Sequence, residues 1–257
     1  MPAAAFDVST PSTLSSCVVF ASPHSGRDYS WSFMRKTVLN EHAIRSSEDA
    51  FVDQLFECAP QFGAPFIKAG APRAYVDLNR APDELDPALI EGVRRKMHNP
   101  RVASGLGVIP RVVANGRAIY RGKMPLSEAQ DRIKQYWHPY HNRLHALLDT
   151  AHARHGQAVL IDCHSMPHEA MDGVARAGMR RPDVVLGDRF GAAASGDVVD
   201  RIEAAFTDAG FTVTRNAPFA GAYITQAYGK PAKMPARRSG RNRPLALHER
   251  STDPPQW

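Results

Sequence analysis

The sequence predicts an α/β fold, in which strands and helices alternate along the chain. Residues 17–22 and 158–161 are short apolar runs, and each is followed by polar residues and a histidine. Runs of this kind are typical of buried central strands. Helix-like segments separate these runs from the other strand-like runs, which is the pattern of an α/β domain.

The other elements are predicted from periodicity and punctuation in chain order. Residues 81–125 are rich in Pro, Gly and Arg and predict a long loop system, with short strands around 107–109 and 118–120. Asp49 and Asp53 are four residues apart and should share one face of a helix that starts at Ser46. The expected helices cover 31–40, 46–56, 126–154 (capped by Ser127) and 196–209, and the expected strands cover 66–69, 73–78, 184–188 and 211–214.

Length and composition predict one domain over residues 17–230, preceded by a leader (1–16) and followed by an atypical tail (231–257). No apolar run is long enough for a transmembrane helix, and the leader lacks the features of a signal peptide. The three cysteines are widely spaced, which favours a reducing compartment over a disulfide framework. We therefore expect a cytoplasmic protein without a membrane partner.

The net charge of +6 would suit a nucleic-acid-binding protein, but its distribution argues against one. The segment from Lys230 to Trp257 carries seven Lys or Arg and two acids, so residues 1–229 carry a net charge of only +1. The basicity belongs to the tail, and nucleic acid is not an expected partner.

His24 and His164 follow the two strongest strands, so they could meet at one edge of the sheet, where α/β proteins bind ligands. Two histidines and a carboxylate are a common ligand set of catalytic zinc. Glu48, Asp49 and Asp53 are the candidate carboxylates. The alternative is that the histidines are ordinary core or loop residues and that the acids only favour a helix N-terminus.

Asn79 and Arg80 end a strand-like run, and an arginine near a metal can bind a substrate carboxylate through two hydrogen bonds. Arg73 has the same interpretation, and for both arginines a plain surface position is the alternative. The remaining histidines near the long helix follow no ligand spacing and are expected mostly at the surface: His98, His138, His141, His145, His152 and His155. No phosphate-binding loop, dinucleotide motif or nucleophile elbow occurs.

Seven segments in matching order resemble the N-formylglutamate amidohydrolases, over roughly residues 15–230. They are SPHSG (22–26), SEDAFVDQLF (47–56), PRAYVDLNR (72–80), YWHPYH (136–141), DCHSMP (162–167), PDVVLGDR (182–189) and NAPFAGAYIT (216–225). The resemblance implies a single three-layer domain of the phosphorylase/hydrolase-like type, with a mixed sheet flanked by helices, related to zinc carboxypeptidases and aspartoacylase-like enzymes.

The resemblance also implies a zinc hydrolase that cleaves N-formyl-L-glutamate to formate and L-glutamate in histidine catabolism. On this basis His24, Asp49 and His164 are the expected metal ligands, with Glu48 as the alternative to Asp49. Related enzymes place the carboxylate three residues after the first histidine, but Arg27 occupies that position here. Asn79, Arg80 and Arg73 are expected to bind a small substrate that carries carboxylates.

The tail departs from the family, in which a C-terminal strand resembling VEIDRSLYM is expected to supply a glutamate as general base. Here the basic, Pro-rich segment contains Glu249 as its only glutamate, and the catalytic base stays unassigned. Residues 240–250 (GRNRPLALHER), written with permitted codons and read one base later, give VEIDRSLYMN. We therefore infer a frameshift near residues 230–239, and we expect a poorly packed tail from about residue 232.

Two further interpretations stay open. A zinc amidase could act on another N-acyl amino acid or on a peptide, because the substrate loops cannot be interpreted from sequence. A chain of the same fold could also bind zinc and substrate while turning over weakly, since it lacks the usual base.

Overall fold

A computed structural model describes residues 1–94, 99–172, 180–229 and 242–250, the last segment as backbone alone. The chain groups into two compact units whose segments interleave along the sequence. The first unit contains Met1–Val8, Pro23–Asp53 and Ile67–His145, and the second contains Ser9–Ser22, Gln54–Phe66 and the chain from Ala146 onward. A single domain over residues 17–230 stays a prediction.

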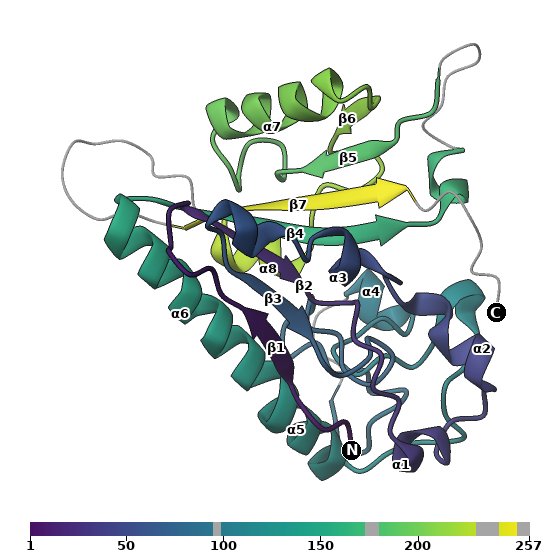
Figure 1. The fold of residues 1–257 in the computed structure, drawn as a ribbon. Coiled ribbons are helices and arrows are strands. Elements are labelled where there is room, and N and C mark those ends of the chain that lie inside the picture. Colours follow the sequence, from purple (N-terminus) through teal and green to yellow (C-terminus); the bar gives the residue numbers. More distant parts are fainter. Residues whose placement is uncertain (95–98, 173–179, 230–241, 251–257) are drawn as a thin grey trace. The chain divides into compact units, whose positions relative to one another are not determined.

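The second unit is built on a mixed sheet, which confirms the predicted α/β class. Its strands lie in the order β2-β4-β7-β5-β6, and Figure 1 shows β7 between β4 and β5. β2 and β7 both run parallel to β4, β5 runs antiparallel to β7, and β6 runs parallel to β5. The strand bounds are β2 Val18–Ser22, β4 Ala158–Met166, β5 Val184–Gly187, β6 Val213–Arg215 and β7 Asn242–Arg250.

Two helices of the second unit pack against this sheet. Helix α7 (Gly196–Asp208) contacts β5 and β6, and α8 (Tyr223–Tyr228) contacts β7 and β4. β4 is apolar from Ala158 to Ile161 and has neighbours on both sides, so it forms the centre of the core. The predicted strands at 17–22 and 184–188 and the helix at 196–209 are confirmed with small shifts of their ends, and the strand predicted at 158–161 forms but extends to Met166.

The first unit contains one long helix and several short ones. Helix α5 (Leu126–Arg132), a π-helical segment (Ile133–Trp137) and α6 (His138–His155) follow one another without a break, and the end of α6 belongs to the second unit. The other helices are α1 (Trp31–Met34), α2 (Glu41–Ile44), α3 (Val52–Leu55) and α4 (Pro100–Ala103). Strands β1 (Phe6–Ser9) and β3 (Phe66–Ala69) are neighbours in the sheet.

Several predicted elements of the first unit are wrong in type or length. The helix expected over 31–40 ends at Met34, and the N-cap of α5 is Pro125 rather than Ser127. No strand forms at 73–78 or 107–109. Around 118–120 only isolated bridges form, between Val112 and Ala118 and between Thr37 and Tyr120. These segments make their hydrogen bonds with side chains and loops, which periodicity does not reveal.

β7 differs from the expectation of a poorly packed tail. Its backbone pairs with β4 from Ala158↔Asn242 to Met166↔Arg250, and with β5 on its other side. The rest of the tail lies outside the described residues. Within the described part of the chain, no helix combines the length and the apolar character that crossing a bilayer requires.

Candidate metal centre

His164 lies inside β4, which corrects the predicted end of that strand at Ile161. β4 reaches Met166 because β7 pairs with its whole length, whereas the pairing with β2 reaches only Asp162. Asp162 and His164 are two residues apart and therefore share one face of the strand. Both are buried, and His164 Nε2 lies 3.0 Å from Asp162 Oδ2. This contact orients the ring and leaves Nδ1 as the candidate ligand atom.

His24 lies in the turn that follows β2, and it is 2% exposed. The turn passes so close to the neighbouring backbone that a Cβ at Gly26 would collide with the carbonyl oxygen of Ala71. The Asp49 N–H donates to the carbonyl oxygen of His24 at 3.1 Å, which joins two loops distant in sequence. Glycine at position 26 and this backbone bond place His24 beside Asp49.

The two ring nitrogens of His24 face two different carboxylates. Nε2 lies 2.7 Å from Asp77 Oδ1, and Nδ1 lies 3.4 Å from Asp49 Oδ2. The first distance is that of a strong, charge-assisted hydrogen bond. The second exceeds the usual N–H···O range and suits two ligands of one ion. His24 therefore presents Nδ1 toward Asp49, and Asp77 fixes its tautomer.

Asp77 is a buried hub that sequence reasoning missed. Its carboxylate accepts hydrogen bonds from the Asn79 N–H at 2.8 Å and from Arg73 Nε at 3.1 Å, besides its contact with His24. Burial alone would raise the pKa of Asp77, but His24, Arg73 and Arg80 hold it well below its ordinary value. The missed signal was an aspartate two residues before the Asn79-Arg80 pair.

The segment around Asp77 is not a strand, because side chains of the long helix bind its carbonyl groups. Arg132 Nη1 donates to the Tyr75 carbonyl, Trp137 Nε1 to that of Arg80, and His141 Nε2 to that of Leu78. The π-helical segment separates Arg132 from Trp137, and such irregular turns are frequent at functional sites. The helix thus fixes a loop that no β-ladder supports.

The predicted helix from Ser46 is wrong, and the error concerns the candidate carboxylates. A 3₁₀ turn ends at Ser47, and Phe51 has a φ of 64°, which interrupts the helix before α3 begins at Val52. Asp49 therefore lies in a loop and shares no helix face with Asp53. Asp53 instead pairs with Arg27 at 2.6 Å.

Glu48 faces a different set of partners from its neighbour Asp49. Its carboxylate pairs with Arg45 at 3.1 Å and accepts a hydrogen bond from Tyr29. Burial raises the pKa of Glu48, although Tyr29 and Arg45 partly oppose this effect. Of the two alternatives, the geometry favours Asp49 as a metal ligand.

Within the described residues, His24, Asp49 and His164 form a group that could hold a metal ion. Each offers one ligand atom, all three atoms lie within 4.8 Å of one another, and all three residues are buried. Two imidazoles and one carboxylate are a donor set suited to a divalent transition metal. The aspartates on the outer nitrogens are partners of the kind that metal-bound histidines usually have.

The predicted substrate-binding residues lie on the segment that carries Asp77. Asn79 and Arg80 are buried, and Arg73 is partly buried. Arg80 donates from Nε to the Leu106 carbonyl and from Nη1 to the Asn79 carbonyl. Burial lowers the pKa of Arg80, the charge of Asp77 partly opposes this effect, and the charge of Arg73 adds to it. The plain surface position is therefore wrong for Arg80.

The other histidines near the long helix differ in burial. His138 and His145 are exposed, and His152 and His155 are partly buried. His141 is 5% exposed and stacks on Trp137, so its expected surface position is wrong. Burial lowers the pKa of His141 to about 4, although its bond to the Leu78 carbonyl opposes the shift. His98 lies outside the described residues.

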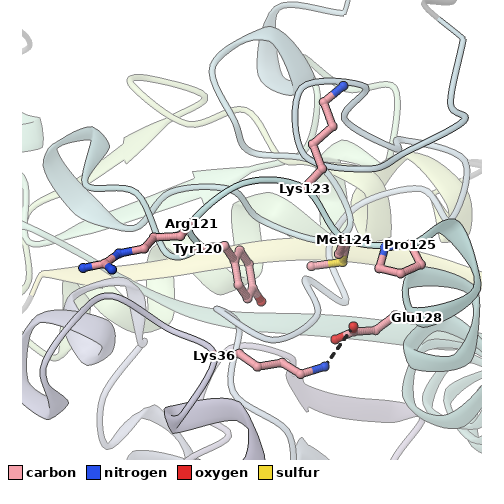
Figure 2. A pocket seen from close by; sticks show the side chains of 7 residues that line it. All are labelled: Lys36, Tyr120, Arg121, Lys123, Met124, Pro125 and Glu128. Carbon is pink, nitrogen blue, oxygen red and sulfur yellow. Dashed lines mark hydrogen bonds and ion pairs between the residues drawn. The ribbon is translucent and has the colours of Figure 1, made fainter.

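A pocket of about 210 Å³ opens elsewhere on the first unit, and no member of the metal group lines it. In Figure 2, Lys36 and Glu128 point toward each other and form an ion pair of 2.9 Å, while Lys123 extends away. Arg132 binds both Glu128 and Tyr120 in the pocket wall and also the Tyr75 carbonyl. The pocket thus lies against the framework that holds the Asp77 segment.

The comparisons with known proteins identify the family of this chain. The family model of the N-formylglutamate amidohydrolases matches residues 16–236. The chain is 30% identical to the N-formylglutamate deformylase of Pseudomonas putida, over 84% of this chain and 76% of that protein. It is also 30% identical to the deformylase of Pseudomonas aeruginosa, over 76% and 68% of the two chains.

Solved structures support the same assignment. The crystal structure of N-formylglutamate amidohydrolase from Ralstonia eutropha matches with a TM-score of 0.85 and 32% identity, over 95% of this chain and 85% of that chain. A gene product of Agrobacterium tumefaciens shares the fold alone, with a TM-score of 0.65 and 15% identity over 97% and 86% of the chains. The chain belongs to the N-formylglutamate amidohydrolase family, a family of hydrolases.

Proposed function

We propose that this chain hydrolyses N-formyl-L-glutamate to formate and L-glutamate with the help of zinc, as a step of histidine catabolism. The observation that carries the proposal is the buried group of His24, Asp49 and His164 in a chain of this family. We also propose the finer fold assignment, a three-layer hydrolase domain related to the zinc carboxypeptidases.

Zinc fits the residues that are present. Catalytic zinc typically has three protein ligands, and two histidines with a carboxylate are a frequent set. His24 and His164 each have an aspartate near Nε2, so each can direct Nδ1 to the ion. Bound zinc would supply a Lewis acid that polarises the formyl carbonyl and makes water a stronger acid.

Arg73, Asn79 and Arg80 are proposed to bind the substrate. Arg73 is partly exposed, and its side chain is fixed by Asp77. Its charge interacts with that of Asp49, so it lies near the candidate ligands. A guanidinium in this position can hold a carboxylate or stabilise negative charge that develops on the attacked carbonyl. Asn79 and Arg80 would orient the carboxylate nearer the amide bond.

Amide hydrolysis also needs a group that accepts a proton and passes it to the leaving amine. The family resemblance places a glutamate for this role in the C-terminal strand. The strand here is β7, whose sequence differs, and the family match ends at residue 236, just before β7 begins at Asn242. Glu249 is the only glutamate of that tail, and we do not assign it as the base.

This difference supports a second candidate function, a chain that binds metal and substrate but turns over weakly. Formate release from N-formyl-L-glutamate by the zinc-loaded chain tests the first function, and calorimetric binding of the same compound tests the second. Release that a chelator abolishes supports hydrolysis. Binding without release supports the second candidate, and the absence of both contradicts both proposals. Activity greater on another N-acyl amino acid would contradict the substrate assignment.

A further inference from the structure

A second arginine lies close to Arg80, on a loop to which Arg80 is bonded. Arg80 Nε donates to the Leu106 carbonyl at 2.9 Å, and the Leu106 N–H donates to the Arg101 carbonyl at 2.8 Å. Arg101 belongs to the four-residue helix α4, and sequence reasoning assigned it no role. The backbone of Leu106 therefore bridges the buried guanidinium of Arg80 and the backbone of Arg101.

The backbone around Arg101 is fixed at both ends. At its start, the Asn99 side chain accepts hydrogen bonds from the N–H groups of Arg101 and Val102. At its end, the Arg111 N–H donates to the Gly105 carbonyl at 2.8 Å, and Arg111 Nη2 donates to the Ala103 carbonyl. Arg101 is therefore an exposed side chain on a rigid loop, which limits the entropy lost when it binds a ligand.

The groups around this loop carry an excess of positive charge, which favours the binding of an anion. Burial and the positive charges of Arg73 and Arg101 lower the pKa of Arg80, and the carboxylates of Asp77 and Glu84 oppose this effect. Asp77 is already shared by His24 and Arg73. Among the residues that the structure describes, Arg101 forms no ion pair with a carboxylate. Like charges held together in this way favour a bound anion, and guanidinium groups bind carboxylates well.

We propose that Arg101 binds the side-chain carboxylate of an N-acyl dicarboxylic amino acid, while Arg80 binds the α-carboxylate. The assignment rests on the proposed function and extends it to substrate selection. Arg80 follows Asn79, whose N–H is bonded to the aspartate that orients His24, so it lies nearer the metal group. Arg101 lies two hydrogen bonds further on, beyond Arg80 and Leu106. In N-formyl-L-glutamate the α-carboxylate is the nearer of the two to the amide bond, and the side-chain carboxylate is the farther.

This arrangement makes Arg101 a residue that discriminates glutamate from glutamine. N-formyl-L-glutamine has nearly the same shape, but its neutral amide cannot form an ion pair with a guanidinium. A hydrogen bond between charged groups in a partly exposed site corresponds to roughly a 10- to 100-fold difference in affinity. Loss of the Arg101 charge should remove that difference without weakening the neutral ligand.

The test is calorimetric binding of N-formyl-L-glutamate and N-formyl-L-glutamine to the zinc-loaded full chain and its R101Q variant. We expect R101Q to weaken binding of the glutamate compound by about 10- to 100-fold and that of the glutamine compound less than about twofold. The matched control is R94Q, which removes another exposed arginine of the same region and should change neither affinity. Equal weakening of both ligands by R101Q, or no change in either, would overturn the assignment.

Failure of the inference is distinct from failure of the proposed function. Binding reports on Arg101 even if the chain lacks turnover, whereas formate release reports on hydrolysis. A chain that releases formate equally fast from both compounds hydrolyses N-formyl amino acids but does not select through Arg101, and this result overturns the inference alone. If R101Q still prefers the glutamate compound as strongly as the unchanged chain does, the inference is also overturned and the proposed function is not.

Discussion

β2 and β7 both pair with β4 and run parallel to it, but only β2 lies within the part of the chain that matches the family. β2 pairs with β4 through Val18↔Val159 to Ala21↔Asp162 and leads into the turn that holds His24. β7 pairs with the other edge of β4 along its whole length, through Met166↔Arg250. The first side keeps the family's sequence around the metal group, and the second side lies beyond the family match.

Strand pairing and catalysis make different demands on the amino-acid sequence. A strand pairs through backbone N–H and C=O groups, so a segment of unrelated sequence can occupy a central position. A general base must be one particular side chain at one place. A chain can therefore complete its sheet with β7 and still lack a side chain placed for proton transfer.

Neutralising the carboxylate ligand on the preserved side should have the largest effect, because it should remove the metal and with it all metal-dependent turnover. Asp49→Asn should reduce bound metal from about one ion per chain to less than about a tenth, because a neutral amide is a much poorer ligand. The matched variant is Glu48→Gln, one residue away, which removes a charge paired with Arg45 rather than a ligand. Metal analysis after gel filtration measures both. If Asp49→Asn retained the metal and Glu48→Gln lost it, Glu48 rather than Asp49 would be the ligand.

On the other side of β4, restoring a glutamate in β7 should raise turnover. Replacing residues from 240 onward by the shifted-frame sequence VEIDRSLYMN should raise formate release by roughly 10² to 10⁴, the usual contribution of a general base. Bound zinc should stay unchanged, because His24, Asp49 and His164 precede the replaced segment.

The control for this exchange is the same restored chain with glutamine in place of its new glutamate, assayed for formate at equal zinc content. It should show the low rate of the original chain. Full activity of the original chain would show that another group serves as base, and the frameshift hypothesis would lose its chemical support.

A smaller effect is expected at Asp77, which binds His24 but not the ion. Asp77→Asn keeps the shape of the side chain and should weaken zinc affinity by roughly 10- to 100-fold, as loss of an outer carboxylate partner does. A competition titration with a chromophoric chelator measures this affinity. Asp86→Asn is a suitable comparison, since Asp86 is a buried partner of Arg111 and should leave zinc affinity unchanged. Equal affinities in the Asp77 variant and the unchanged chain would remove Asp77 from the site.

The smallest effect is a pH dependence of stability at His141. Its pKa is about 4 in the folded chain against an ordinary value of 6.5. Between these two pH values, His141 is therefore mostly protonated in the unfolded chain and mostly neutral in the folded chain. The stabilisation from the neutral ring is complete above about pH 6.5 and is lost as the pH falls toward 4, by about 2 kcal/mol at pH 5.

Urea unfolding at pH 7 and pH 5 measures this term. His141→Gln should lose about 2 kcal/mol less than the unchanged chain over that interval, and a variant of the exposed His145 should behave like the unchanged chain. An identical pH dependence in all three proteins would show that His141 is not a buried neutral group.

The sequence predicts the strand-borne part of the site better than the loop-borne part. The apolar run before His164 identifies β4 directly, although its end depends on β7, a partner distant in sequence. The alternation in residues 73–78 suggested a strand, but helix side chains bind the Tyr75, Leu78 and Arg80 carbonyls instead. Such tertiary bonds override local pattern. Family resemblance points to Asp49, whereas periodicity misplaces it on a helix that the positive φ of Phe51 interrupts.

The metal content of the full chain and of two single variants, His24→Ala and His164→Ala, is the decisive test of the proposed centre. We predict about one zinc per chain, and loss of most of it in each variant, because each histidine supplies one of the three ligand atoms. Circular dichroism would confirm that both variants fold. Full zinc content in either folded variant would contradict the proposed centre and, with it, the zinc-dependent mechanism.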